Sequence, residues 1–279
     1  MFERFLIPVD FSDQSLHMFE CISHLCEGEN REMILIHVHG RGENIDPEQG
    51  KRIYQMLSQV RDEGIKAKFI KAEGNPVEVI LETAKREEIS LIAMASSGKG
   101  MAREFIVGST SLGVVRNSDI PVLIDKFQVW DDGGEVKVRK TCIDHLESAI
   151  VPLDFTSCND TVLQTLDDLI EKGLKTAILF HVIDSSRYKV SDDLRFQQVK
   201  EELETIKENI DPKGCEVITH VHFGSPVYNI IEVTREFSST LIVMGTHGKS
   251  LLHEMTLGSV SEEVIRKSTV SLLIVPCKK

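Results

Sequence analysis

Hydrophobic residues follow two alternating patterns along the chain. Short apolar, β-branched runs such as MILIHV at 33–38 and SLLIVP at 271–276 alternate with longer segments in which apolar residues recur at helical spacing. This alternation is typical of a parallel sheet whose strands are joined by crossover helices. Because the short runs are almost continuously apolar, we expect their strands to be covered on both faces.

The pattern predicts the same order of elements in each half of the chain. In the first half, strands are predicted near residues 4–9, 32–38, 66–72, 90–94 and 121–125, with helices near 13–27, 47–63, 75–87 and 104–117. In the second half, strands are predicted near residues 147–152, 176–182, 215–222, 240–244 and 271–275. Each half is therefore expected to form an α/β domain around a five-stranded, doubly wound parallel sheet.

The two halves are copies of one unit. FLIPVDFSDQS, from Phe5, matches AIVPLDFTSCN, from Ala149, at an offset of 144 residues, whereas from Gly74 and Gly224 onward the offset is 150. An insertion around residues 184–200 accounts for the difference. Repetition on this scale indicates a duplicated domain. We place the domains at residues 1–126 and 147–279.

Residues 127–146 form the predicted linker between the domains. Within it, FQVW and VKVR alternate around DDGG, which predicts a β-hairpin. Two interpretations remain open. The hairpin is either a linker without a function of its own, as most connections are, or an arm that holds a partner subunit.

Composition excludes several classes of protein. The formal net charge of -12 argues against broad attraction to nucleic acid or to an anionic membrane, so an anionic ligand must be held locally. No apolar run approaches the roughly 18 residues that a membrane span needs. The six cysteines form no C-x-x-C pair and fall mostly in apolar segments, as free thiols of a reducing compartment do. We therefore expect a cytoplasmic protein.

The segment GTHGKSLLHEMTLGS, which begins at Gly245, carries the main candidate chemistry. It is not a P-loop, which would need a glycine at Val243. Gly245 and Gly248 let the backbone turn tightly and approach a ligand. Gly258 and the following serine open a predicted helix, whose free N–H groups and dipole can face an anion. These elements frame a phosphate-sized concavity at the carboxyl ends of the strands, where ligands of such sheets bind.

Polar residues near this segment have open roles. Asp154 follows the first strand of the second half, where it either caps the next helix or accepts hydrogen bonds from a ribose hydroxyl or an adenine amine. Both roles cannot be fully served at once. His247 and Lys249 lie in the glycine loop, where they either contact a phosphate or remain solvated.

Together, PLDFTS, LFHVID, GSP and MGTHGKSLLHEMTLGS resemble the universal stress protein family, whose nucleotide-binding members carry G-x2-G-x9-G-[ST]. Residues 245–259 fit this motif without departure, and the resemblance covers both halves apart from the linker. It implies an adenine nucleotide alpha hydrolase-like fold and a UspA-like regulatory protein of the stress response. The implied ligand is ATP, AMP or ADP, with or without Mg²⁺, and the implied ATPase activity is at most weak.

The resemblance also implies site residues, position by position. Contacts to the adenosine end fall on Pro152, Asp154 and Val182. Contacts to the ribose and phosphates fall on Met244, Gly245, Gly248, Gly258, Ser259 and Val260. No catalytic residue is assigned.

The first half departs from the motif at Ala95, which replaces the first glycine. Its weaker candidate site consists of Pro8, Asp10, Val38, Met94, Gly98, Gly108 and Ser109. An alanine is tolerated where φ is negative, but it crowds the ligand if the backbone is left-handed or in contact with it. We expect the second site to bind more tightly, and a vacant first site is the alternative.

Histidines raise the question of a metal site. His37-x-His39 and His220-x-His222 each place two imidazoles on one face of a strand, and a nearby carboxylate could complete a site. However, His37 and His181 occupy equivalent positions in apolar runs, which fits packing, and no H-x3-H or C-x2-C spacing is present. A structural or surface role is favoured, and no metal site is predicted.

Hydrolysis would need an oriented water, a base and charge neutralisation at the γ-phosphate. His247, His253 and Glu254 are close in sequence, but nothing assigns one of them as the base. The S-G-G-x-D-S and H-x-G-H signatures of ATP pyrophosphatases and nucleotidyl transferases are absent. Binding is therefore favoured over turnover. A slow ATP hydrolase and a non-catalytic interaction scaffold with vestigial pockets remain the alternatives.

The last strand of each half, at 121–125 and 271–276, is expected at a sheet edge. Because a bare apolar edge aggregates, we expect the two domains to cover each other's edges as an internal pseudo-dimer. Pairing of whole chains into a homodimer, and the identity of a protein partner that reads nucleotide occupancy, are left open by the sequence.

Overall fold

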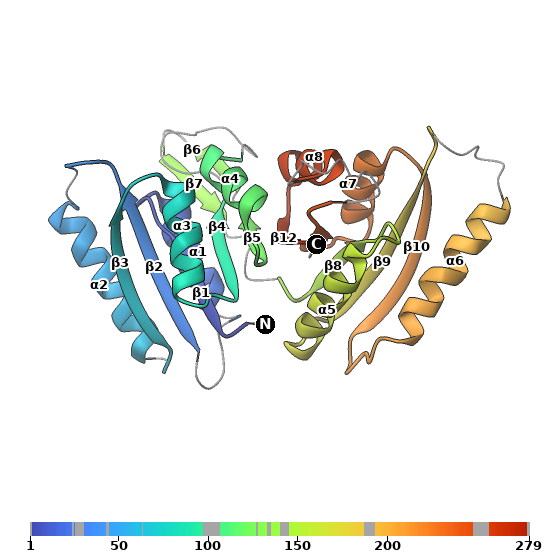
Figure 1. Cartoon of the computed structure of the whole chain (residues 1–279), viewed down its shortest axis with the longest axis horizontal. Helices are drawn as coiled ribbons and strands as arrows, with labels where there is room; N and C mark the ends of the chain where they lie inside the picture. Colours follow the sequence, from blue (N-terminus) through green and yellow to red (C-terminus); the bar gives the residue numbers. More distant parts are fainter. Residues whose placement is uncertain are drawn as a thin grey trace. The chain divides into compact units, whose positions relative to one another are not determined.

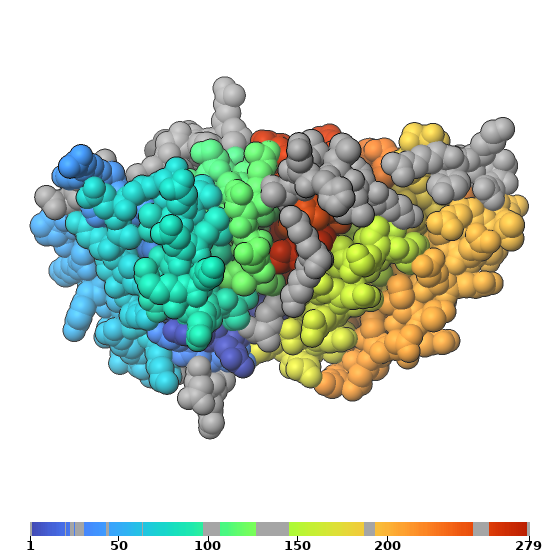
Figure 2. All heavy atoms as spheres, in the orientation of Figure 1, coloured from blue at the N-terminus to red at the C-terminus, as the bar shows by residue number. Residues whose placement is uncertain are grey.

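The chain forms two compact units, Met1–Ile143 and Asp144–Lys279, in its computed structural model (Figure 1). The structure describes residues 2–23, 25, 31–42, 45–62, 64–96, 107–126, 128–132, 135–139, 145–186, 193–247 and 257–277. Across these ranges, every helix is too short or too polar to cross a membrane. Side chains fill the spaces between the elements of each unit (Figure 2).

The first unit contains a parallel five-stranded sheet with the order β3-β2-β1-β4-β5. Its strands are β1 (Arg4–Pro8), β2 (Glu32–His39), β3 (Lys66–Glu73), β4 (Leu91–Ala95) and β5 (Val122–Asp125). Strands β2 and β3 follow β1 on one side of it, and β4 and β5 lie on its other side. Between β1 and β4 the direction of the crossovers reverses, which creates a ligand-binding crevice in folds of this type.

The second unit repeats this topology with the order β10-β9-β8-β11-β12. Its strands are β8 (Ser148–Pro152), β9 (Thr176–Asp184), β10 (Glu216–Gly224), β11 (Leu241–Gly245) and β12 (Ser271–Val275). The predicted duplication of a parallel α/β fold is therefore confirmed. Consecutive residues of the central strands, such as Phe5 to Ile7, are fully buried, as expected for sheets covered on both faces.

Helices cover both faces of each sheet. They are α1 (Asp13–Ser23), α2 (Pro47–Asp62), α3 (Pro76–Arg86), α4 (Ser109–Asn117), α5 (Cys158–Glu171), α6 (Asp193–Glu208), α7 (Pro226–Glu236) and α8 (Ser259–Lys267). Figure 1 shows α2 and α3 on opposite sides of the first sheet and α6 and α7 on opposite sides of the second. Crossovers leaving on opposite faces are what makes each sheet doubly wound.

The start of α3 follows local capping chemistry. The Asn75 side chain accepts hydrogen bonds from Val77 N at 3.0 Å and Glu78 N at 3.4 Å, and proline occupies the first position of α3. The helix predicted near 104–117 starts later than expected, because α4 begins at Ser109 and Gly108 is extended, with φ -65° and ψ 153°. Apolar spacing alone did not reveal this boundary, since Val107 is buried without being helical.

The residues between the two repeats include a two-stranded antiparallel sheet. Strands β6 (Gln128–Asp132) and β7 (Glu135–Arg139) pair with the register Gln128↔Arg139 to Asp132↔Glu135. This hairpin belongs to the first unit.

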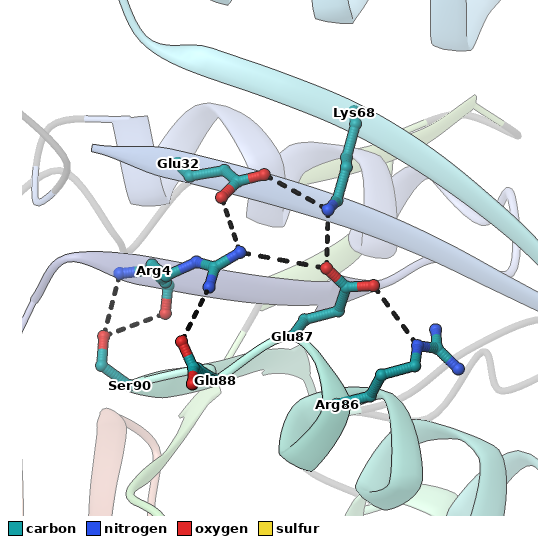
Figure 3. Close-up of polar contacts among 7 residues, drawn as sticks. All are labelled: Arg4, Glu32, Lys68, Arg86, Glu87, Glu88 and Ser90. Carbon is teal, nitrogen blue, oxygen red and sulfur yellow. Dashed lines mark hydrogen bonds and ion pairs between the residues drawn. The ribbon is translucent and has the colours of Figure 1, made fainter. Parts of the chain in front are cut away.

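A charged cluster lies at the amino ends of the strands of the first unit (Figure 3). Arg4 Nη2 lies 2.8 Å from Glu32 Oε2, and Lys68 Nζ lies 2.6 Å from Glu87 Oε2. The hydrogen bond between Lys68 and Glu87 raises the pKa of the lysine and lowers the pKa of the carboxyl group. The equivalent residues of the second unit are uncharged: Ser148, Thr176, Ile218 and Phe237. The cluster is far from the carboxyl edge of the sheet, and we assign it a structural role.

The cysteines correct one expectation from the sequence. Cys158 and Cys277 form a disulfide that joins the start of α5 to the residues after β12, with their Cα atoms 4.8 Å apart. Cys21 is also disulfide-bonded. Among the described cysteines only Cys215 is a free thiol, and burial raises its pKa. The prediction of free thiols is therefore wrong for three cysteines, and the cysteine pattern no longer argues for a reducing compartment.

Candidate functional site

A cavity of about 300 Å³ lies at the carboxyl ends of the strands of the second unit. It is bounded by the residues that follow β8, the last residues of β9 and β11, and the start of α8. Its position corresponds to the crevice between β8 and β11, where the crossovers change direction. Its volume is at the lower end of the range for small-molecule sites.

Nearly all the second-unit residues singled out from the sequence line this one cavity. They are Pro152, Asp154, Val182, Met244, Gly245, Gly258, Ser259 and Val260. His247 also lines it. Gly248, Lys249, His253 and Glu254 lie outside the described residues. Residues that are up to 108 positions apart along the chain, from Pro152 to Val260, are thus brought together by the topology.

Asp154 divides its two carboxylate oxygens between two environments. Its Oδ1 accepts hydrogen bonds from Thr156 N at 3.2 Å and Thr156 Oγ1 at 2.7 Å, which closes the turn after β8. Its Oδ2 is buried and has no hydrogen-bond partner in the part of the chain that the structure describes. The helix cap of α5 is Ser157, so Asp154 does not serve as that cap. The local role of Asp154 is therefore the turn with Thr156 and not the helix cap, and this role uses only Oδ1.

The unpartnered Oδ2 indicates a missing hydrogen-bond donor. Leaving a buried acceptor unsatisfied costs roughly 1–3 kcal/mol, and more for a charged group. Asp154 lines the cavity, so a hydroxyl or amine of a bound ligand can supply the donor. The residues present therefore fit the adenosine end of a nucleotide.

The start of α8 supplies hydrogen-bond donors, whereas Asp154 supplies an acceptor. Gly258 N donates to Thr246 O at 2.7 Å, and Ser261 Oγ donates to Gly245 O at 2.9 Å, so the end of β11 and the start of α8 are held together. Gly258 has no side chain to cap the helix. The first N–H groups of any α-helix lack intrahelical acceptors. Because Ser259 to Ser261 line the cavity, an anion bound there would face these groups.

The disulfide lies beside Thr246 and His247, the first residues after β11. Cys277 N donates to Thr246 Oγ1 at 3.2 Å, and the His247 N–H points to Cys277 Sγ at 3.4 Å. Cys158 itself lines the cavity. The bridge therefore joins α5, in the cavity wall, to Cys277, whose hydrogen bonds hold the first residues after β11.

Sequence reasoning missed several residues of the cavity wall, among them Cys158, Asn159 and Arg195. Arg195 belongs to α6 and lies within the insertion around residues 184–200, which the first repeat lacks. This difference between the repeats was the one sequence feature that could have pointed to Arg195. A guanidinium group suits phosphate oxygens because its donors match them in pairs. Arg195 therefore adds a cation to a cavity in which the sequence had located only helix N–H groups, His247 and Lys249.

His181 and His37 have the same structural role in the two units. His181 Nδ1 donates to Leu153 O at 2.6 Å, and its ring stacks on Phe155 at 4.6 Å. His37 Nδ1 donates to Val9 O at 2.7 Å, and its ring lies 4.5 Å from Phe11. Both histidines therefore hold the carbonyl that follows the first strand of their unit, which agrees with the packing role expected from the sequence.

The residues of the weaker candidate site occupy equivalent elements of the first unit. Pro8 ends β1, Val38 lies in β2, Met94 lies in β4, and Gly108 and Ser109 begin α4. Asp10 Oδ1 accepts hydrogen bonds from Ser12 N at 3.0 Å and Ser12 Oγ at 2.5 Å, like Asp154 in the second unit. Gly98 lies outside the described residues.

The backbone around the first-unit loop also matches that of the second unit. Gly108 N donates to Ser96 O at 2.7 Å, and Ser111 Oγ donates to Ala95 O at 3.0 Å. Ala95 does not have a positive φ. The alanine is therefore compatible with the backbone of this loop.

Comparisons with known proteins agree on one family. The model of the universal stress protein family matches residues 1–126 and 146–276. A universal stress protein of Methanocaldococcus jannaschii is 27% identical over 152 residues, which cover 46% of this chain and 94% of that protein. One from Bacillus subtilis is 28% identical over 146 residues, which cover 44% of this chain and 99% of that protein.

Similarity to a solved structure extends over the whole chain. The crystal structure of a universal stress protein from Archaeoglobus fulgidus is 26% identical, with a TM-score of 0.71, and the match covers 100% of this chain and 98% of that one. A Pseudomonas aeruginosa protein of unknown function has a TM-score of 0.73 at 13% identity, which shows a shared fold.

Proposed function

The chain belongs to the universal stress protein family, and from this premise we propose that its second unit binds ATP or a related adenine nucleotide. The observation that carries the proposal is the buried, unpartnered Oδ2 of Asp154 in the wall of the cavity. The glycine motif of the sequence, of which Gly245, Gly258 and Ser259 line the cavity, supports it, because that motif accompanies nucleotide binding in the family that the sequence resembles.

The cavity offers different chemistry to the two ends of a nucleotide. Pro152 and Val182 supply apolar surface for the adenine, and Asp154 Oδ2 accepts a hydrogen bond from a ribose hydroxyl or the adenine amine. The phosphates lie toward the start of α8, where the Ser259 hydroxyl and the helix N–H groups donate and Arg195 adds positive charge. Mg²⁺ enters with the phosphates, which supply oxygen ligands for it.

Nucleotide binding is proposed chiefly for the second unit and as a regulatory property. In the first unit the same backbone carries Ala95 in place of the first glycine, and we expect weaker binding there. Among the described residues around the cavity, His247 is the one imidazole whose loop position suits a general base, and its backbone is bound to Cys277 Sγ. Because no described residue of the cavity is assigned to orient a water beside His247, slow hydrolysis at most is proposed.

The test begins with the ligand itself. The chain is purified without added nucleotide and denatured, and any nucleotide released is identified by mass spectrometry. The nucleotide-free chain is then titrated with ATP by calorimetry. We expect an adenine nucleotide in the first experiment or ATP binding in the second. If neither is found at millimolar ATP, nucleotide binding is rejected and the scaffold alternative stands.

Two matched variants locate the site. Asp154→Asn removes the charged acceptor while its other oxygen keeps the turn with Thr156, and affinity should fall at least about 10-fold because a hydrogen bond to a charged group is lost. Asp10→Asn makes the same change in the first unit and should leave the tighter binding event unchanged. Equal affinity of Asp154→Asn and wild type would place the nucleotide elsewhere. Released phosphate, measured in parallel, separates binding from slow hydrolysis.

A further inference from the structure

Three side chains of the second unit form a cluster outside the nucleotide cavity. His220 and His222 lie on β10, and Glu236 is the last residue of α7. One ligand atom from each of the three lies within 4.8 Å of the others. We propose that this cluster binds a divalent transition-metal ion of the zinc type.

The topology explains why these three residues meet. Successive residues of a strand point to opposite faces, so His220 and His222 share the same face of β10. The helix that follows β10 packs against this part of the sheet and returns Glu236 to the histidines. Because the carboxylate comes from another element, 14 residues beyond His222, spacing within the strand could not reveal it.

The distance between the imidazoles suits metal coordination. His220 Nε2 and His222 Nε2 lie 2.9 Å apart. Two ring nitrogens bound tetrahedrally to Zn²⁺ at about 2.0–2.1 Å would lie roughly 3.3 Å apart, so a shift of a few tenths of an ångström brings the two imidazoles to this spacing. The carboxylate of the exposed Glu236, which lies within 4.8 Å of both, then has to move toward the ion. Two histidines and one carboxylate are a donor set that zinc uses, and they leave the fourth position to water.

Asn229 holds His222 in the orientation that a ligand needs. The Asn229 amide donates from Nδ2 to Ser225 O at 2.9 Å, which fixes its oxygen toward His222 Nδ1 at 3.1 Å. Because an amide oxygen only accepts, Nδ1 carries the hydrogen and Nε2 presents its lone pair toward His220. Orienting contacts of this kind commonly support metal-bound histidines.

Aromatic rings restrict the movement of His220. The ring of Phe180 stacks on it at a centroid distance of 5.8 Å, and the ring of Phe237 meets it edge-on at 5.2 Å. Without metal, the two imidazoles can share one hydrogen between their Nε2 atoms. A metal ion replaces that hydrogen and uses the same two lone pairs.

The first unit shows that the fold does not require these side chains. The residues equivalent to the two histidines, Asn229 and Glu236 are Ile70, Ala72, Val79 and Arg86. The first unit forms the same strand and helix without them. The second unit therefore carries in this place two metal-binding imidazoles, a carboxylate and an orienting amide that packing alone does not demand.

The experiment measures metal binding directly. The chain, without an affinity tag, is stripped of metal and nucleotide with its disulfides intact, so that thiols from the bridges do not compete. Titration with Zn²⁺ by calorimetry should show one ion per chain, and Co²⁺ should give the strong visible absorption of a tetrahedral site. Glu236→Gln and His222→Gln should each weaken Zn²⁺ binding at least about 10-fold, and Asn229→Ala by about 10-fold.

A control comes from the other histidine pair. His39→Gln alters the His37-x-His39 pair of the first unit and should leave the affinity unchanged. Glu236 is exposed, so Glu236→Gln is expected to fold even if a histidine variant does not. Zn²⁺ binding that is absent in the wild type, or equal in Glu236→Gln and His39→Gln, would overturn the proposal.

Discussion

The sulfur of Cys158 occupies the space that a side chain on Gly245 would need. A Cβ added to Gly245 collides with Cys158 Sγ and lies 3.2 Å from Cys277 Sγ. Gly245 does not have a positive φ, so backbone conformation does not require a glycine there. A glycine is required at this position because the disulfide packs against it. The sequence interpretation, in which this glycine serves the approach of a ligand, is therefore incomplete.

The same relationship explains the alanine of the first unit. Ala95 occupies the position of Gly245, and the residue equivalent to Cys158 is Gln14. Without a sulfur against this position, the methyl group of Ala95 is accommodated, and it is buried. The difference between the two motifs thus follows a difference between their neighbours.

Gly245→Ala should destabilise the second unit by about 1–3 kcal/mol, because the disulfide must move to admit the methyl group. In a Cys158→Ala, Cys277→Ala background the cost should largely disappear. Urea unfolding of the four proteins measures both effects. Ala95→Gly is the control and should cost about 1 kcal/mol or less. The same cost of Gly245→Ala in both backgrounds would contradict the packing explanation.

The disulfide should itself contribute to stability. Cys158 and Cys277 are 119 residues apart in sequence, so their bridge closes a long loop in the unfolded chain. Replacing both by alanine should lower the free energy of unfolding by roughly 2–4 kcal/mol, measured by urea unfolding without reductant. Cys215→Ala, which removes a free buried thiol, is the control for loss of a buried cysteine side chain. A double variant no less stable than Cys215→Ala would show that the bridge does not stabilise the fold.

Lys126 should make stability depend on pH in the alkaline range. Burial lowers its pKa to about 8 from an ordinary value of 10.5. Between these values the unfolded chain binds one more proton than the folded chain, so the free energy of unfolding rises with pH. The rise is at most roughly 3 kcal/mol by pH 10.5.

Lys126→Met should remove this rise. The measurement is urea unfolding of wild type and variant between about pH 7 and pH 10, and the difference between the two isolates Lys126 from other titrating groups. Lys66→Met removes an exposed lysine of the same unit and should keep the wild-type slope. Parallel pH profiles of Lys126→Met and wild type would mean that the lysine is not perturbed.

Glu87 should contribute stability that is lost in acid. Its pKa is lowered mainly by the hydrogen bond from Lys68, so its contribution is present above the unfolded pKa and disappears as pH falls through the folded value. Because Lys68 is 41% exposed, solvent screens the pair, and we expect Glu87→Gln to cost about 0.5–1 kcal/mol at pH 7.

The cost of Glu87→Gln should shrink and then vanish as pH falls through the lowered pKa of the folded state, because the wild-type carboxyl group is then protonated as well. Glu88→Gln is the matched control, since Glu88 is 87% exposed and lies 3.7 Å from Arg4. It should change stability less than Glu87→Gln does. A cost that persists unchanged into acid would assign the effect to packing and not to charge.

The sequence by itself determined the features that local chemistry controls. Apolar periodicity located the strands, and the duplication predicted two copies of one parallel fold. The spacing of glycines from Gly245 to Gly258 marked one wall of the cavity. These features are readable because strand and helix periods, turns and helix starts depend on neighbouring residues.

The tertiary structure alone decided which distant residues meet. It joined Cys158 to Cys277, brought Arg195 into the cavity wall, and placed Glu236 beside His220. It also left one oxygen of Asp154 without a hydrogen-bond partner among the described residues. Such contacts depend on how the strands are ordered and how the helices pack against them. The number of residues between two positions along the chain does not give their distance in space.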